Sequence, residues 1–251
     1  MNGLDFIVTG TGRCGTVSVA KHLSSIGLMC GHETVFHADS LQLAKWRWNH
    51  RRLQPSVVST HELENQTWKE TCRWFDPNKM IGDCSLMAAP FLSDPELATT
   101  RKVLLVRNLK KVVLSFIEKL NYFSHNDVGH SSHTENNKVI QRFLTSHLRK
   151  IDDYDDQFHR TVEYVVGWIE MILNQIDQEL FVQRIEDPFL PLNRLLGNDS
   201  IDKRPQRYNQ LGTYKPNGKL FQKILCAHLS KRFHDLQKRF GYEPIPIAMI
   251  I

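Results

Sequence analysis

The sequence predicts an α/β fold in which a central parallel sheet is covered by helices on both faces. Short apolar runs alternate with helical patterns along the chain, and this alternation is typical of parallel strands joined by crossover helices. A glycine-rich loop joins the first apolar run to the first helical pattern, which is where open α/β sheets bind phosphates. With 251 residues, 41% of them hydrophobic, the chain can bury one substantial core. We therefore expect a single domain over residues 1–251.

Buried parallel strands are short, continuous apolar runs without polar alternation. Four runs have this character and are the predicted strands: Phe6 to Val8, Met80 to Ile81, Val103 to Val106, and Leu180 to Val182 with a continuation to Ile185. The glycine loop follows the first of these runs, and an arginine follows the third.

Helical patterns fill most of the chain between these runs. The first covers about Thr16 to Ile26 and stops at Gly27, a residue type that often ends helices. The segment Lys110 to Leu120 places its apolar residues on one face and Ser115 off that face. The other predicted helices are Leu41 to Arg52, one that begins at Ser59 with a capping box completed by Glu62, Asn137 to Ile151, Phe158 to Ile176, and Leu220 to Phe240. The polar stretches 124–135 and 199–218 are expected to be surface loops.

The composition indicates which class of ligand the protein binds and which cellular compartment it occupies. A net charge of +5 favours anionic ligands, but acidic residues lie between the basic ones, so nucleic acid is not indicated. The five cysteines form no CxxC pair and no secretory signal precedes the first strand, which predicts a reducing cytoplasm. No run approaches the roughly 20 apolar residues of a membrane span, so we expect a soluble protein. The sequence does not indicate an oligomeric state.

The loop after the first strand is predicted to bind an anion. Its glycines lie on both sides of Arg13 and let successive backbone N–H groups converge on one point, with the start of a helix behind them. Gly10 and Gly15 have the spacing of a nucleoside triphosphatase loop, but Thr16 and Val17 follow where that loop has Lys and then Ser or Thr. The lysine for the outer phosphates and the hydroxyl for magnesium are both missing. The anion therefore need not be a magnesium-bound triphosphate, and no metal is expected.

A second anion site is predicted at the end of the third strand. Arg107 follows that strand directly, and Ser115 lies eight positions later on the next helix. Because ligands bind beyond the C-terminal strand ends of an open α/β sheet, Arg107 should emerge at the same edge as the glycine loop. The two sites together predict a ligand with phosphate-like groups at both ends.

These motifs resemble those of the sulfotransferase family, whose donor is 3′-phosphoadenosine 5′-phosphosulfate (PAPS). The 5′-phosphosulfate loop of tyrosylprotein and many bacterial members is similar to Gly12, Arg13, Cys14, Gly15 and Thr16, with Val17 where many members have a second threonine. The family's 3′-phosphate motif is similar to Val106, Arg107 and Asn108 with Ser115, and Leu109 stands where a proline is frequent. Its Arg-Tyr-Glu-Asp segment resembles residues 184–187, with Ile185 in place of tyrosine.

The resemblance implies a three-layer α/β/α fold of the P-loop nucleoside triphosphate hydrolase type and transfer of a sulfuryl group from PAPS. The acceptor would be a hydroxyl, or less commonly an amine, of a small molecule or carbohydrate, and the product of the donor would be 3′-phosphoadenosine 5′-phosphate (PAP). The donor-binding residues that it implies are Gly12, Arg13, Cys14, Gly15, Thr16, Val17, Arg107 and Ser115, with Lys203 and Arg204 as candidates for the family's basic C-terminal segment.

The catalytic candidates are Arg13, Glu33 and His32. Arg13 keeps its charge and offers paired donors, so it suits the stabilisation of the departing phosphate. Glu33 lies twenty residues after Arg13, where the chain returns toward the sheet, and its placement resembles that of the catalytic glutamate of tyrosylprotein sulfotransferases. A carboxylate is a plausible general base if burial raises its pKa toward neutrality. His32 is the alternative base, and a solvated Glu33 without a catalytic role stays open.

Two other functions fit part of the same pattern. One is a P-loop nucleotide kinase or phosphotransferase, which the missing lysine and Val17 disfavour. The other is a nucleotide-binding module without turnover. His125, His130 and His133 have irregular spacing, so we expect a loop that covers the acceptor and not a zinc site. Residues 184–187 are expected to fix the strand end through internal hydrogen bonds.

Overall fold

The computed structural model describes residues 4–33, 36, 82–120, 123, 143–176, 180–197 and 225–243. Several predictions fall on other residues and lie outside the described ones. They are the helices over 41–52 and from residue 59, the strand at 80–81, the loops 124–135 and 199–218, and the first parts of the helices over 137–151 and 220–240.

Within the described ranges, five parallel strands form one sheet in the order β2-β3-β1-β4-β5. The strands are β1 (Phe6–Thr9), β2 (Cys30–His32), β3 (Gly82–Cys84), β4 (Arg101–Val106) and β5 (Phe181–Arg184). β1 lies at the centre, with Phe6 opposite Gly82 of β3 and Arg101 of β4. The predicted strands at 6–8, 103–106 and 180–185 are therefore confirmed.

Strand β2 is a correction to the sequence prediction, which left residues 30–32 in a connecting segment. The strand has the sequence CGH and contains no apolar run that would signal it. Its parallel pairing with β3, in which Cys30 lies opposite Gly82 and His32 opposite Cys84, holds it in the sheet. All three of its residues are buried, so tertiary pairing overrides a weak local preference.

The helices are α1 (Thr16–Ser25), α4 (Leu109–Leu120), α6 (Gln157–Asn174), α7 (Leu190–Leu195) and α8 (Ala227–Arg239), with 3₁₀ turns η2 (Leu86–Phe91), η3 (Pro95–Leu97) and η4 (Arg149–Asp153). The prediction that a helix reaches Ile151 is wrong at its C-terminal end. Residues 143–147 are helical, but Leu148 has φ −127° and ψ 74°, and the 3₁₀ turn η4 follows. α6 begins where predicted because Asp156 accepts hydrogen bonds from the N–H groups of Phe158 and His159.

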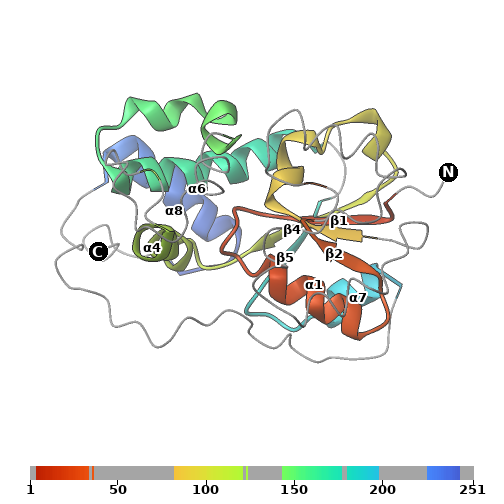
Figure 1. Ribbon diagram of the computed structural model, residues 1–251. Helices are drawn as coiled ribbons and strands as arrows, with labels where there is room; N and C mark the ends of the chain where they lie inside the picture. Colours follow the sequence, from red (N-terminus) through yellow and green to blue (C-terminus); the bar gives the residue numbers. More distant parts are fainter. Residues whose placement is uncertain are drawn as a thin grey trace.

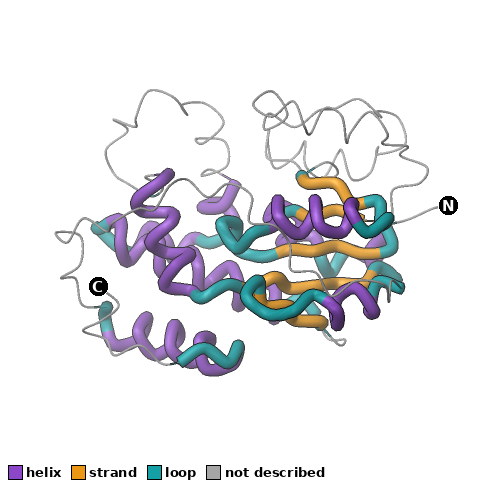
Figure 2. The backbone as a smooth tube through the Cα atoms, turned by 90° about the horizontal axis from the view of Figure 1, so that it is seen from below, coloured by secondary structure: helices purple, strands orange, loops and turns teal. Residues whose placement is uncertain are grey.

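The sheet separates two apolar layers. On one face, Ile7 and Leu104 belong to a core cluster that also holds residues of α4, α6 and α8. On the other face, Phe6 and Val8 pack with apolar residues of α1 and α7. Figure 1 shows α1 and α7 beneath the sheet, apart from the group of α4, α6 and α8. In the perpendicular view of Figure 2 the strands form one layer with helices around it, so the three-layer α/β/α prediction is confirmed.

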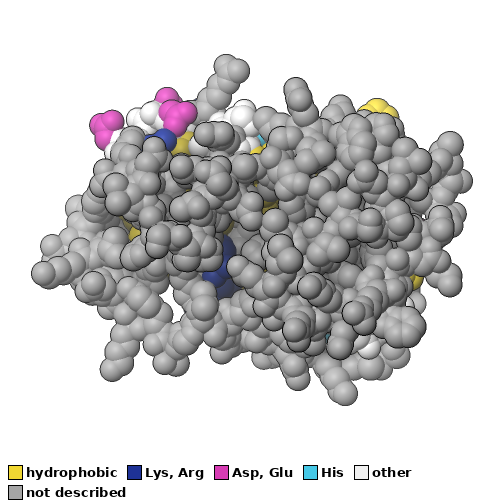
Figure 3. All heavy atoms as spheres, viewed as in Figure 1, with side chains coloured by type: hydrophobic (Ala, Val, Ile, Leu, Met, Phe, Trp, Pro, Cys, Tyr) yellow, Lys and Arg dark blue, Asp and Glu magenta, His cyan; other side chains and the backbone are white. Residues whose placement is uncertain are grey.

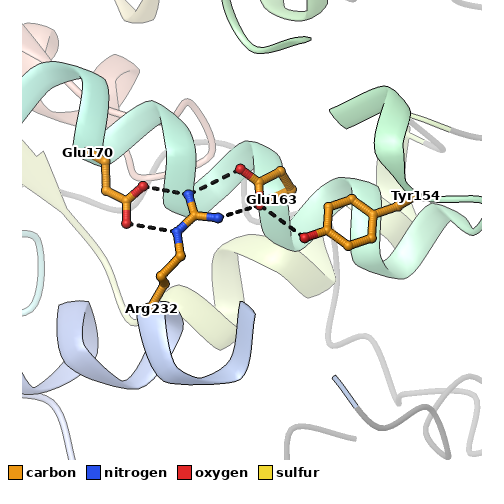
Figure 4. A network of polar contacts seen from close by, with 4 residues as sticks. All are labelled: Tyr154, Glu163, Glu170 and Arg232. Atoms are coloured by element: carbon orange, nitrogen blue, oxygen red, sulfur yellow. Dashed lines mark hydrogen bonds and ion pairs between the residues drawn. The ribbon is translucent and has the colours of Figure 1, made fainter. Parts of the chain in front are cut away.

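An ion-pair network joins α6 to α8. Arg232 donates through Nη1 to Oε2 of Glu163 at 2.6 Å and through Nε to Oε1 of Glu170 at 3.0 Å. Figure 4 shows the guanidinium between these two carboxylates, with Tyr154 on the far side of Glu163. Glu163 is only 2% exposed, so the ion pair with Arg232 offsets the hydration that this carboxylate loses on burial.

The surface carries charges of both signs. Figure 3 shows acidic side chains at one edge of the face drawn and a Lys or Arg side chain nearer its centre. In the described ranges, no helix is long and apolar enough to cross a membrane.

Candidate active site

The glycine loop follows β1 and has an unusual backbone. Gly12, Arg13 and Gly15 have φ values of 73°, 52° and 106°, all in the left-handed region. At Gly12 a Cβ atom would lie 2.8 Å from Cδ2 of Leu86, so both the conformation and the space call for glycine. The left-handed turns curl the loop, as the sequence predicted.

Two side chains of helix α6 donate hydrogen bonds to backbone carbonyl groups of the loop. The indole Nε1 of Trp168 donates to the backbone carbonyl oxygen of Gly10 at 3.1 Å. The hydroxyl of Tyr164 donates to the backbone carbonyl oxygen of Thr11. Both aromatic side chains are completely buried. The two contacts fix the loop from the side of the larger core.

Helix α1 begins directly after the loop without a side-chain cap. Its N-cap is Gly15, which has no side chain to cap the helix, and the first turn has no acidic residue. The first N–H groups of a helix and its dipole favour a negative charge. The start of α1, which lies beside the loop, therefore suits an anion.

The structure brings the two predicted anion sites together. Nε of Arg13 donates to Oγ of Ser115 at 2.9 Å, and Nη1 of Arg107 donates to the carbonyl oxygen of Arg13 at 3.1 Å. These contacts join residues 102 and 94 positions apart in the chain. They form because β1 and β4 are neighbours in the sheet, so the loop after one strand lies beside the arginine after the other.

Three further residues of the predicted donor motif, Cys14 in the loop and Thr16 and Val17 in α1, are accounted for by their packing. Burial raises the pKa of the Cys14 thiol to about 11, although nearby loop N–H groups and Arg107 oppose the rise, so Cys14 stays a neutral thiol. Oγ1 of Thr16 lies 3.1 Å from Nε2 of His32. Val17 packs against the core cluster under α1.

Glu33 follows β2 at the same edge of the sheet. Its backbone N–H donates to the carbonyl oxygen of Cys84 at 3.1 Å, and Glu33 is only 8% exposed. Burial raises the pKa of Glu33 to about 8, and the nearby carboxylate of Asp83 is a second, smaller cause of this rise. The sequence prediction required such a rise for a general base. His32, the alternative base, is buried with its ring against Thr16.

Asp83 is a residue of this site that the sequence reasoning missed. It lies in the middle of β3, is completely buried, and its Oδ2 accepts a hydrogen bond from the N–H of Phe36 at 3.2 Å. A carboxylate in the middle of a short buried strand is unusual, and that signal could have drawn attention to it.

Residues 184–187 form the internal hydrogen bonds that the sequence predicted. Glu186 accepts from the N–H of Asn108 at 3.3 Å, and Nη1 of Arg184 donates to the carbonyl oxygen of Gly241 at 3.1 Å. Lys203 and Arg204 lie outside the described residues, as do the three histidines of the loop 124–135. In the part of the chain that is described, no group of three or more His, Cys, Asp or Glu side chains is arranged to hold a metal ion.

Comparison with known proteins supports the fold. No protein-family model and no curated protein sequence matches the chain. Among solved structures, it is similar to a sulfotransferase from Alicyclobacillus acidocaldarius, with a TM-score of 0.50 and 12% sequence identity over 97% of this chain and 98% of that one. The chain therefore has the three-layer, P-loop-like fold found in a sulfotransferase.

Proposed function

We propose that the protein is a sulfotransferase that moves a sulfuryl group from PAPS to a hydroxyl, or less readily an amine, of a small molecule or carbohydrate. The observation that carries this proposal is the contact of Arg13 with both Ser115 and Arg107. This contact supports the proposal because it joins two arginines at neighbouring strand ends, where a nucleotide with phosphates at both ends would bind. The shared fold supports the same conclusion.

Donor binding divides between the two strand ends. The backbone from Gly12 to Val17 and the uncapped start of α1 would hold the 5′-phosphosulfate, with the guanidinium of Arg13 beside it. Arg107 and Ser115 would hold the 3′-phosphate, and Lys203 with Arg204 would add charge to it. Arginine suits both positions because it presents paired donors to phosphate oxygens.

The reaction needs a proton acceptor and a stabiliser of negative charge. The acceptor oxygen forms a bond to sulfur while the bond from sulfur to the phosphate oxygen breaks, so the electron pair of that bond leaves with PAP. Glu33 would take the proton of the acceptor hydroxyl, because its carboxylate has a pKa near neutrality and lies at this edge. Arg13 and the loop N–H groups would stabilise the charge on the departing phosphate.

A nucleotide kinase is less well supported. Such an enzyme needs a hydroxyl for magnesium after the loop lysine, and the corresponding Val17 packs into the apolar cluster under α1. The donor therefore has no magnesium ligand at that position.

Calorimetry with PAP and with adenosine 5′-monophosphate (AMP) tests the donor. We expect clearly tighter binding of PAP, because Arg107 and Ser115 are assigned to the 3′-phosphate, which AMP lacks. Equal affinities would contradict the proposal. Release of PAP from PAPS in a screen of carbohydrates and small alcohols then tests transfer, and donor binding without transfer to any acceptor would identify a nucleotide-binding module instead.

A further inference from the structure

The turn that carries Arg107 is held on both sides by the segment after β5. The N–H of Ile185 donates to the carbonyl oxygen of Val106 at 2.9 Å, just before Arg107. Oε1 of Glu186 accepts from the N–H of Asn108 at 3.3 Å, just after it. The backbone of Arg107 is thus bracketed by two contacts with residues about 80 positions later in the chain.

Tyr242 holds the other oxygen of the same carboxylate. Its hydroxyl donates to Oε2 of Glu186 at 2.8 Å. Burial, together with Glu186, raises the pKa of Tyr242, so the hydroxyl keeps its proton and remains a donor. One carboxylate therefore links the Arg107 turn to the C-terminal end of α8.

The end of α8 is built to place Tyr242 there. Gly241 has a left-handed φ of 69°, its N–H donates to the carbonyl oxygen of Lys238 at 3.0 Å, and the N–H of Tyr242 donates to that of Gln237 at 2.9 Å. This pair of bonds is the Schellman motif, which reverses the chain after a helix. Arg184 then secures the ring, because its guanidinium lies 4.4 Å from the ring centroid of Tyr242 and donates to Gly241.

The start of α4 is occupied by protein acceptors. Asn108 donates to Glu186, Leu109 donates to Oε1 of Gln237 at 3.4 Å, and Lys111 donates to Oδ1 of Asn108 at 3.3 Å. These N–H groups are therefore not directed at a phosphate. An anion at this strand end depends on the side chains of Arg107 and Ser115, and so on the geometry of the turn.

We propose that Glu186 and Tyr242 are positioning residues for the 3′-phosphate: they fix the turn at Arg107 and thereby couple the end of α8 to donor recognition. This inference rests on the proposed function, since it assumes that Arg107 meets a 3′-phosphate. Neither residue needs to touch the donor. The coupling acts through the N–H of Asn108.

The test compares the binding of PAP and AMP by calorimetry in the full chain, in Tyr242→Phe and in Glu186→Gln. Tyr242→Phe removes the hydroxyl that donates to Glu186, and Glu186→Gln removes the carboxylate charge and leaves one acceptor oxygen in place of two. We expect PAP affinity to fall about tenfold in each variant. AMP affinity should be unchanged, because AMP lacks the 3′-phosphate. Tyr154→Phe is the matched control, since it removes a hydroxyl that donates to Glu163 at 3.4 Å, and it should keep both affinities.

The possible results separate this inference from the proposed function. A wild-type preference for PAP that survives in both variants would overturn the positioning role alone. An equal loss of PAP and AMP binding, with a lower melting temperature by circular dichroism, would show a general folding role and also overturn it. No preference for PAP in the wild type would overturn the proposed function and this inference with it.

Discussion

Glu33 is constrained in both its backbone and its side chain. Its φ of 51° is left-handed, which a residue with a Cβ atom adopts at a cost of about 1 kcal/mol. The hydrogen bond from the N–H of Glu33 to the carbonyl oxygen of Cys84 holds that conformation, one residue beyond the end of β2. Strained residues of this kind cluster at functional sites, which agrees with the proposed role as general base.

Replacing Glu33 by Gln should remove the proton acceptor and keep the shape of the side chain. We expect kcat to fall by about 10²- to 10⁴-fold, which is the usual contribution of a general base. PAP affinity, measured by calorimetry, should be unchanged because Glu33 is not assigned to the donor. A variant that keeps its wild-type rate would exclude Glu33, and His32→Gln would then be the next variant to assay.

The rate should depend on pH through the same carboxyl. Because burial and Asp83 raise the pKa of Glu33 to about 8, most of it is protonated at neutral pH, and the active ionised form increases as pH rises. We expect kcat/KM to increase with pH and to level off above about pH 8. Asp83→Asn removes the like charge and keeps an oxygen for the N–H of Phe36, so the midpoint should move to lower pH. A profile that does not shift in this variant would contradict the influence of Asp83.

At the scale of elements, Arg232 of α8 adds two ion pairs with α6 to the apolar packing between these helices. Arg232 bonds to Glu163 and Glu170, and the Glu163 side chain is nearly inaccessible to water. Replacing Arg232 by Met would leave that carboxylate buried without its partner, which we expect to lower the free energy of unfolding by about 3 kcal/mol. Urea unfolding followed by circular dichroism measures the change.

Lys231→Met is the matched control for this prediction. Lys231 is the preceding residue, and its side chain is 78% exposed while it pairs with Asp235 at 2.6 Å. Exposed ion pairs contribute little, so this variant should change the free energy of unfolding by less than about 0.5 kcal/mol. Equal losses in the two variants would show that the buried network carries no special weight.

The elements that the sequence predicted are those with a clear local signal. The apolar runs at β1, β4 and β5 and the amphipathic patterns of α4 and α6 contain their own periodicity. β2 could not be predicted, because three residues of sequence CGH are a strand only through their pairing with β3. The end of the helix at residue 147 was missed for a similar reason, since no glycine or proline marks it.

At the scale of the molecule, the sequence predicted that Arg107 and the glycine loop lie at one edge of the sheet, because the topology determines it. Arg107 and the glycine loop meet because both follow parallel strands, and parallel strands end at one edge of the sheet. The contacts of Asp83 with Phe36 and of Tyr242 with Glu186 could not be predicted in this way. They join residues 47 and 56 positions apart, and no spacing rule relates these residues.

The glycine loop lies against α6, α4 and the segment after β5. Trp168 of α6 bonds to Gly10, the ring of Phe116 on α4 lies beside Gly12, and Ile185 after β5 lies beside Gly15. A ligand that binds both the loop and Arg107 would therefore restrain β1, β4 and their helices together. Its effect should extend beyond the residues that it touches.

Hydrogen exchange with and without PAP measures this effect across the chain. At about 100 times its dissociation constant, PAP should stabilise the folded state by about 2.7 kcal/mol, which slows exchange wherever the opening requires its release. We expect the strongest slowing in the loop and the first turn of α1, and at the turn from β4 into α4. AMP at the same multiple of its own dissociation constant should slow exchange at the loop and leave residues 107–116 nearly unchanged, because it has no group for Arg107. Protection of the two segments by AMP and PAP alike would mean that residue 107 does not distinguish the nucleotides, and the assignment of the 3′-phosphate to this strand end would have to be abandoned.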